Sequence, residues 1–312
     1  MIFKNYVELT DHIISKAKKT PFAIVCADES HTMEAVIESY QKQLILPVFI
    51  GDKKNITEYL TANGLNASDF EIIDETDPTR AAQTAVSLVH DGSVRGIMKG
   101  KLDTSQLMKV LLKSENKLRT SSVVCAMSLM EIPYYHKLVA ASDPALCIHP
   151  SLDKKVAIIN NAVTALNNIG IECPKTAILS ASESPNPKIP ESLEAVQLKE
   201  MNQQGLIKNC IIDGPLSYDL CFDPESAKIK GLTSDVAGDP DLIIYPDLVT
   251  GNAFSLFPPD LHGSRLIRSH LRCSIHLRKI TCTHCIGKCT IIHSTIGADP
   301  VTVLNPRLCC LI

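Results

Sequence analysis

Two lysines separated by one glycine form the first candidate for a chemical site. Lys99, Gly100 and Lys101 follow a short apolar run and precede a helical pattern. The lysines supply positive charge, the glycine lets a ligand approach the backbone, and a helix N-terminus capped by Thr104 or Ser105 attracts negative charge. The segment therefore predicts an anion site, although an ordinary strand-to-helix loop fits the same pattern.

Further polar groups follow other apolar runs. Asp143 follows the run 138–141, Asn186 lies in a loop with three prolines, and Asp213-Gly214-Pro215 follows the run 210–212. The polar segment 234–241 precedes the run 242–245, and Gly251-Asn252 comes after it. Ligands of parallel α/β sheets bind at the carboxyl ends of the strands. Each group taken singly also fits a residue that only stabilises a turn.

Strand-like runs alternate with helical stretches and must position these groups. We expect strands at 22–26, 46–50, 70–74, 96–98, 138–141, 175–179, 210–212 and 242–245, and helices after Ser30 and at 81–90, 105–112, 154–169 and 193–203. This alternation predicts α/β structure with parallel sheets covered on both faces. A chain of 312 residues favours two compact units. We expect a first α/β domain at 1–125, a second at 126–252, and a separate tail at 253–312.

Taken together and in order, these segments resemble the phosphate acetyl/butyryltransferase family, most closely its phosphate butyryltransferase branch. The resemblance covers roughly residues 15–252, and the segments that carry it are 98–105, 118–120, 184–188, 211–216, 235–244 and 251–252. It implies two parallel-sheet α/β domains with an interdomain cleft, similar to the isocitrate and isopropylmalate dehydrogenases. It also implies a homo-oligomer and the reaction of acyl-CoA with phosphate to give acyl phosphate and CoA. CoA and phosphate are then substrates, and no cofactor is expected.

This reaction fits the residues. Cations must gather a phosphate and stabilise the oxyanion that forms on the thioester carbonyl, and holding both substrates together supplies much of the acceleration. The expected substrate-binding residues are Lys99, Gly100, Lys101, Arg119, Asp143, Asn186, Asp213, Gly214 and Asn252. The competing interpretation is a solvated surface charge for the three cations and a turn cap for Asp143.

The resemblance stops abruptly after Asn252. Family members continue with an apolar strand that ends in a Ser-Arg pair and is followed by an Asp, and these are central to the family's active site. Here Ser264-Arg265 follows His262-Gly263 instead of an apolar strand. The catalytic residues are therefore unknown, and without that strand we expect the sheet of 22–26, 46–50 and 96–98 to have an open edge. We expect a phosphate acyltransferase with little activity, or a degenerate relic that still binds CoA.

Composition changes at the same place. Residues 253–312 hold seven Lys/Arg against two Asp/Glu, with six of the 12 cysteines and five of the 10 histidines. A change of reading frame near codon 252 accounts for this break best; a divergent but functional tail is the alternative. Cys282, Cys285 and Cys289 with a nearby histidine suggest a zinc site, but two separated ligand pairs are not evident. We therefore expect no structural metal.

The composition of the whole chain argues against several other classes of protein, namely nucleic-acid-binding, membrane and secreted proteins. A net charge of −3 and 4% aromatic residues give little basis for nucleic-acid binding, and the basic tail shows no recognition helix. No apolar run approaches the roughly 18 residues of a membrane span. Residues 1–8 lack the pattern of a signal peptide. We expect a soluble, cytoplasmic protein that binds neither nucleic acid nor membrane.

Overall fold

The computed structural model describes residues 2–16, 19–118, 121–132, 135–256, 291–296 and 299–304. The chain divides into two compact units, one made of Met1–Glu8 with Ser122–Ile280 and the other of Leu9–Ser121 with Thr281–Ile312. The sequence placed a domain boundary at 125/126, and the structure divides the chain at 121/122. Residues 1–8 belong to the unit of Ser122–Ile280, and the division falls within helix α1 (Tyr6–Lys16).

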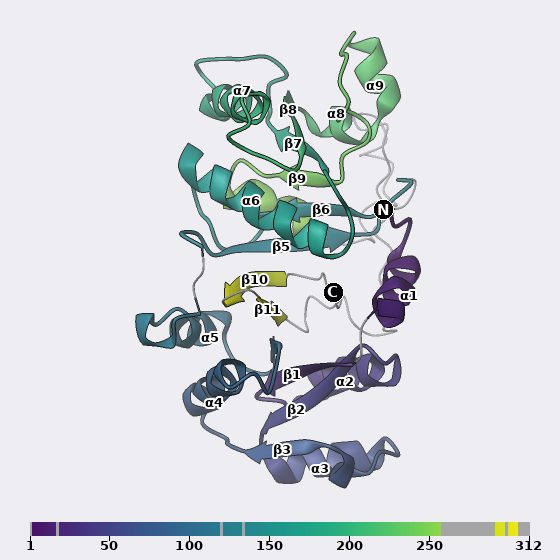
Figure 1. The fold of residues 1–312 in the computed structure, drawn as a ribbon, viewed down its shortest axis with the longest axis vertical. Helices are drawn as coiled ribbons and strands as arrows, with labels where there is room; N and C mark the ends of the chain where they lie inside the picture. The colour runs from purple at the N-terminus through teal and green to yellow at the C-terminus, as the bar shows by residue number, and fades with distance from the viewer. Residues whose placement is uncertain are drawn as a thin grey trace. The chain divides into compact units, whose positions relative to one another are not determined.

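The unit of Leu9–Ser121 contains four parallel strands. They are β1 (Thr20–Val25), β2 (Ile45–Gly51), β3 (Glu71–Asp74) and β4 (Gly96–Lys99), in the order β3-β2-β1-β4 (Figure 1). Strands β1, β2 and β4 are mostly buried, which explains why they read as continuous apolar runs rather than alternating ones. All four lie within two residues of the strands that the sequence predicted.

Four helices connect and cover these strands, and aspartate side chains cap the beginning of three of them. They are α2 (Ser30–Gln41), α3 (Lys53–Ala62), α4 (Pro78–His90) and α5 (Thr104–Leu111), with short 3-10 turns at Ala67–Asp69 and Ser114–Asn116. The Asp52 side chain accepts from the N–H of Asn55 at 3.1 Å, and Asp77 accepts from that of Arg80 at 2.8 Å. Pro78 occupies the first turn of α4, where its missing N–H costs nothing.

Strand β11 (Asp299–Leu304) lies beside β4. It pairs parallel with β4 at Thr302–Leu304 and forms an antiparallel hairpin with β10 (Ile291–Ile296). Without the family's last strand, the edge of this sheet was expected to be open. That expectation was wrong, because β11 occupies the edge of β4. Cys282, Cys285 and Cys289, at which no structural metal is expected, and the pair Ser264-Arg265 lie outside the described residues.

The other unit contains β5 (Cys125–Met130), β6 (Val139–Ser142), β7 (Lys175–Leu179), β8 (Ile211–Leu216) and β9 (Leu242–Ile244). Their order is β5-β6-β9-β7-β8. Strand β5 is antiparallel to β6 and was not foreseen, whereas the β6–β9, β9–β7 and β7–β8 pairs are parallel. The predicted turn at Asp213-Gly214-Pro215 was wrong, since β8 continues through it to Leu216.

Helices α6 (Leu152–Asn168) and α7 (Pro190–Gln203) cross over between β6, β7 and β8, and α8 (Tyr218–Phe222) and α9 (Pro224–Ile229) connect β8 to β9 (Figure 1). Helix α10 (Leu248–Leu256) follows β9. One core cluster joins β6, β7, β8 and β9 to α8 and α9; it includes Val139, Leu179, Leu220 and Ile243. Residues 20–100 and 139–244 thus confirm the α/β class. No helix in the described part of the chain has the length and apolar character to cross a membrane.

Candidate functional site

The order β3-β2-β1-β4 creates a switch point between β1 and β4. The chain moves outward from β1 through β2 to β3 and then returns to the other side of β1 for β4. Right-handed crossovers therefore leave these two strands toward opposite faces of the sheet. Loops at the carboxyl ends of such a pair diverge, and ligands of open α/β sheets bind there. The carboxyl ends are Cys26–Asp28 after β1 and Lys99–Lys101 after β4.

Backbone contacts hold these two strand ends together. The N–H of Gly100 donates to the carbonyl of Val25 at 2.7 Å, and that of Lys101 donates to the carbonyl of Cys26 at 3.0 Å. A Cβ atom on Gly100 would lie 2.0 Å from the Cys26 carbonyl oxygen, so no other residue fits without moving the backbone. Gly100 was predicted to let a ligand approach the backbone. The structure shows that a glycine is needed there because the ends of β1 and β4 are in close contact.

Lys99 is buried, and its ammonium supports the same loop. It donates to the carbonyls of Gly100 at 3.1 Å and Leu102 at 2.6 Å. The thiol of Cys26 lies nearby: burial and the charge of Asp28 raise its pKa to about 11, against the lowering effect of Lys99. The thiol is thus protonated at neutral pH and is a poor nucleophile.

The remaining groups of this site differ from expectation. Lys101 is exposed. Helix α5 is capped by Asp103, whose own N–H donates to Gln106 Oε1 at 3.4 Å, and not by Thr104 or Ser105 as predicted. The negative charge of the Asp103 carboxylate interacts with the positive end of the helix dipole, where an anionic ligand was expected. Arg119 lies outside the described residues.

In the other unit, Asp143 directly follows β6 and organises the loop after it. Its buried carboxylate accepts from the N–H groups of Ala145 at 2.8 Å, Leu146 at 3.0 Å and Cys147 at 2.9 Å. Three converging N–H groups form an anion-binding concavity, and here an internal carboxylate fills it. Burial and the charge of Asp143 raise the pKa of the Cys147 thiol to about 12, so this thiol also stays neutral.

Helix α10 packs closely on the loop that Asp143 organises. The N–H of Leu248 donates to the carbonyl of Ile148 at 3.0 Å. A Cβ atom on Gly251 would lie 2.7 Å from the Asp143 carbonyl oxygen and 2.8 Å from Pro144 Cα. The half-buried Asn252 is therefore held at the carboxyl end of β9, next to the strand end that carries Asp143.

The other three predicted positions lie in the loop after β7 and within β8. Asn186 lies in the loop between β7 and α7, where its backbone N–H donates to Ser192 Oγ at 2.9 Å and its Oδ1 accepts from the N–H of Lys188 at 2.9 Å. Asp213 is buried within β8 and pairs with Lys199 of α7 at 2.6 Å. Gly214 packs against Ile178, because a Cβ atom added at Gly214 would lie only 2.8 Å from the Ile178 Cβ. Asp213 and Gly214 thus have evident packing roles.

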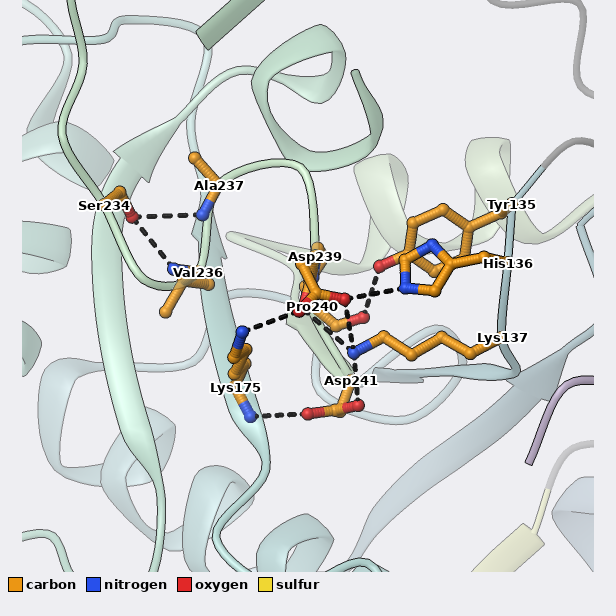
Figure 2. Close-up of polar contacts among 10 residues, drawn as sticks. All are labelled: Tyr135, His136, Lys137, Lys175, Ser234, Val236, Ala237, Asp239, Pro240 and Asp241. Atoms are coloured by element: carbon orange, nitrogen blue, oxygen red, sulfur yellow. Dashed lines mark hydrogen bonds and ion pairs between the residues drawn. The ribbon is translucent and has the colours of Figure 1, made fainter. Parts of the chain in front are cut away.

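The densest ion network in the described residues of this unit lies at the opposite end of the sheet. Figure 2 shows the Lys137 ammonium between Asp239 at 2.8 Å and Asp241 at 2.6 Å, while His136 contacts Asp239 at 2.9 Å. Lys175 pairs with Asp239 at 2.6 Å. Lys137 precedes β6, Lys175 begins β7, and Asp239 and Asp241 precede β9. These are the amino ends of parallel strands, so the segment 234–241 serves to anchor the sheet.

This network strongly perturbs one carboxyl group. Burial by itself would raise the pKa of Asp239, but hydrogen bonds and positive charge from Lys137 and Lys175 outweigh it and lower the pKa to about 2. The Tyr135 hydroxyl, which donates to the Pro240 carbonyl at 2.7 Å, has its pKa raised by burial and by the charges of Asp239 and Asp241. Neither group is placed to meet a ligand at the carboxyl end of the sheet.

Each unit therefore brings part of the predicted set together. In one, Lys99, Gly100 and Lys101 share the switch point; in the other, Gly251 packs on Asp143, and Asn252 is the next residue along the chain. Sequence reasoning did not select Cys26–Asp28, although a polar group directly after an apolar run is the signal that identifies it. It also missed the contacts of Glu183 with Lys230, for which no local signal exists. No group of three or more metal-ligating side chains occurs within the described ranges.

Comparison with known proteins gives consistent results. Residues 78–255 match the family described as phosphate acetyl/butaryl transferase. The chain is 37% identical over 239 residues to a phosphate acetyltransferase of Thermotoga maritima, covering 77% of this chain and 81% of the relative. It is 34% identical over 251 residues to a phosphate butyryltransferase of Clostridium acetobutylicum, covering 80% of this chain and 83% of the relative.

Two solved structures share the fold. A branched-chain phosphotransacylase from Enterococcus faecalis superposes with a TM-score of 0.69 at 24% identity, over 91% of both chains. A phosphotransacetylase from Streptococcus pyogenes gives a TM-score of 0.63 at 21% identity, over 80% of this chain and 83% of the other. At these identities the likeness is one of architecture.

Proposed function

Since this chain belongs to the phosphate acetyl/butyryltransferase family, we propose that it carries a site for transfer of a short acyl group between CoA and phosphate. The observation that carries the proposal is the identity of 37% and 34% to an acetyl- and a butyryltransferase, each over about four fifths of the relative. In this reaction a phosphate oxygen attacks the thioester carbonyl. The carbon–sulfur bond breaks, and the products are acyl phosphate and the CoA thiolate, which takes up a proton.

The chemistry assigns roles to the candidate residues. Phosphate brings negative charge, and more develops on the carbonyl oxygen during attack, so the site needs cations and N–H donors. Lys99 and Lys101 at the switch point are the proposed cations, and Asn252 supplies an uncharged amide. We do not propose Asp143 as a general base, because its carboxylate already accepts hydrogen bonds from three backbone N–H groups.

We further propose that turnover is low and that CoA binding persists. The family match ends at residue 255, near the place where the resemblance of the sequence stops. Beyond that point the sequence lacks the apolar strand that the resemblance leads one to expect before the Ser-Arg pair and the Asp, since Ser264-Arg265 follows His262-Gly263. Binding and positioning groups lie before residue 255 and are retained. This favours a chain that holds its substrates and lacks the groups that accelerate the chemical step.

The test measures turnover and binding separately. Thiol release from acetyl-CoA and butyryl-CoA with phosphate should run at least tenfold below the enzyme median of about 10 per second. Calorimetry with CoA should still show saturable binding. Turnover near that median would contradict the loss of function, while absence of any CoA binding would contradict the assignment of the site.

Three further expectations belong to the same proposal. We propose a homo-oligomer, a cytoplasmic location, and a reaction that needs neither metal nor flavin. Light scattering on the purified chain measures the first. Elemental analysis and an absorption spectrum of the same sample measure the last, and activity that is lost on removal of a bound metal or flavin would contradict it; stoichiometric zinc lost together with folding on chelation would contradict the expectation of no structural metal.

A further inference from the structure

The loop between β7 and α7 is long for its class. It spans residues 180–189, whereas strand-to-helix loops of α/β units typically have about 2–6 residues. It leaves the carboxyl end of β7, the end of a parallel sheet at which ligands bind. A long loop at this end is the kind of segment that carries binding residues, provided that something holds it in one conformation.

Internal hydrogen bonds fold the loop but do not fix its place. Ser182 donates its hydroxyl to the Ser184 carbonyl at 2.7 Å and its N–H to Ser180 Oγ at 3.2 Å. Asn186 is bonded to Ser192 and Lys188 near the start of α7. Between these two sections, the Glu183 side chain reaches out of the loop to residues that follow β8.

Glu183 is held by a clamp that we define as Glu183, Ser217, Asp219 and Lys230. The Lys230 ammonium pairs with Glu183 and, at 2.7 Å, with Asp219. The Ser217 hydroxyl lies 2.7 Å from Glu183 Oε1 and 2.7 Å from Asp219 Oδ1. A hydroxyl has one proton and donates to one of them at a time. Two carboxylates therefore share one hydroxyl, and Lys230 supplies the charge that keeps them together.

Lys230 stabilises the clamp because its positive charge offsets the repulsion between the carboxylates of Glu183 and Asp219. Hydrogen bonds to Asp219 and Glu183 raise the pKa of Lys230, so it stays charged across the neutral range. Without it, Glu183 and Asp219 would face each other across a single proton and repel. Glu183, on the loop, would be displaced from the helices that follow β8.

We propose that Lys230 is a positioning residue that holds the β7–α7 loop, through Glu183, in the conformation that binds acyl-CoA. This inference rests on the proposed function. CoA is by far the larger of the two proposed substrates, and this loop leaves the carboxyl end of β7, the end at which ligands of parallel sheets bind, so a loop held in one conformation would contribute to its affinity. The apparent dissociation constant rises in inverse proportion to the fraction of molecules with a competent loop.

The test compares Lys230→Met with Lys228→Met in the full-length protein. Lys228 precedes Lys230 by two residues, is 79% exposed, and its ion pair with Glu225 is long, at 3.9 Å. Lys230→Met should make the amides of residues 181–188 exchange faster and raise the dissociation constant for CoA about fivefold. Lys228→Met should change neither. Lys230→Arg should restore both, since a guanidinium bonds two carboxylates.

A second variant separates positioning from general destabilisation. In Lys230→Met/Asp219→Asn only one carboxylate is left, and Ser217 can donate to it, so loop protection should recover relative to Lys230→Met alone. Faster exchange with unchanged CoA affinity, or no change in exchange, would overturn the clamp proposal. If the wild-type chain binds no CoA, it is the proposed function that fails, and the exchange data still report on the clamp itself.

Discussion

Lys137 is a buried cation whose main partners are carboxylates. Its side chain is 2% exposed and contacts Asp239 and Asp241 at the amino ends of the strands. Removing one partner of a buried pair leaves uncompensated charge, which costs about 3 kcal/mol. Lys137→Met should therefore lower the free energy of unfolding in urea by about that amount at pH 7. The control Lys54→Met, 82% exposed and 4.0 Å from Glu58, should cost less than about 0.5 kcal/mol.

The same network makes stability depend on pH in the acid range. The folded-state pKa of Asp239 is about 2, below its ordinary value of 3.8, so the folded protein holds this proton less tightly than the unfolded chain. The contribution is complete above the unfolded pKa and is lost as the pH falls from about 4 to about 2. The stability difference between wild type and Asp239→Asn should shrink over this interval. A difference that stays constant down to pH 2 would contradict the assignment.

At the scale of elements, the contact of α10 with the Asp143 loop is fixed by one glycine. A methyl group at Gly251 would meet backbone atoms, 2.7 Å from the Asp143 oxygen and 2.8 Å from Pro144 Cα, and neither can move aside like a flexible side chain. Gly251→Ala should displace α10 and cost about 1–3 kcal/mol. It should also weaken CoA binding through the shift of Asn252. Ala253→Ser, an exposed position on the same helix, should change the free energy of unfolding by less than about 0.5 kcal/mol.

At the scale of the molecule, the hairpin of β10 and β11 covers a sheet edge. Strand β11 has β4 on one side, with Val303 opposite Ile97, and β10 on the other, with Val303 opposite Ile292. Val303→Pro removes one ladder hydrogen bond and should loosen the hairpin. An uncovered β4 edge invites pairing with other chains. Light scattering should then show concentration-dependent association that is absent from the wild type.

The opposite result would be equally informative. If Val303→Pro behaves like the wild type, β11 contributes nothing to the sheet, and a tail without an evolved fold, as after a change of reading frame, accounts for residues 253–312. Hydrogen exchange gives an independent measure, because protection of the amides at 302–304 comparable to that at 242–244 requires a stable strand.

Sequence by itself determined the elements whose signals are local. The strand Lys175–Leu179 was predicted with the bounds that the structure has, because the apolar residues at its end have the length of a buried strand and lie between two helical stretches. The family followed from ordered motifs that need no coordinates, and so did the choice of Lys99–Lys101 as a site at a strand end.

Only the tertiary structure decided the features that depend on long-range pairing. Strand β5 runs antiparallel to β6, and β8 continues through Asp213 and Pro215, because neighbouring strands supply hydrogen bonds that local turn signals do not reveal. The carboxylate of Asp143 fills its own nest of N–H groups, which spacing alone does not show. Glu183 and Lys230 meet across 47 positions of sequence, since the folding of β7, β8 and α9 is what brings their charges together.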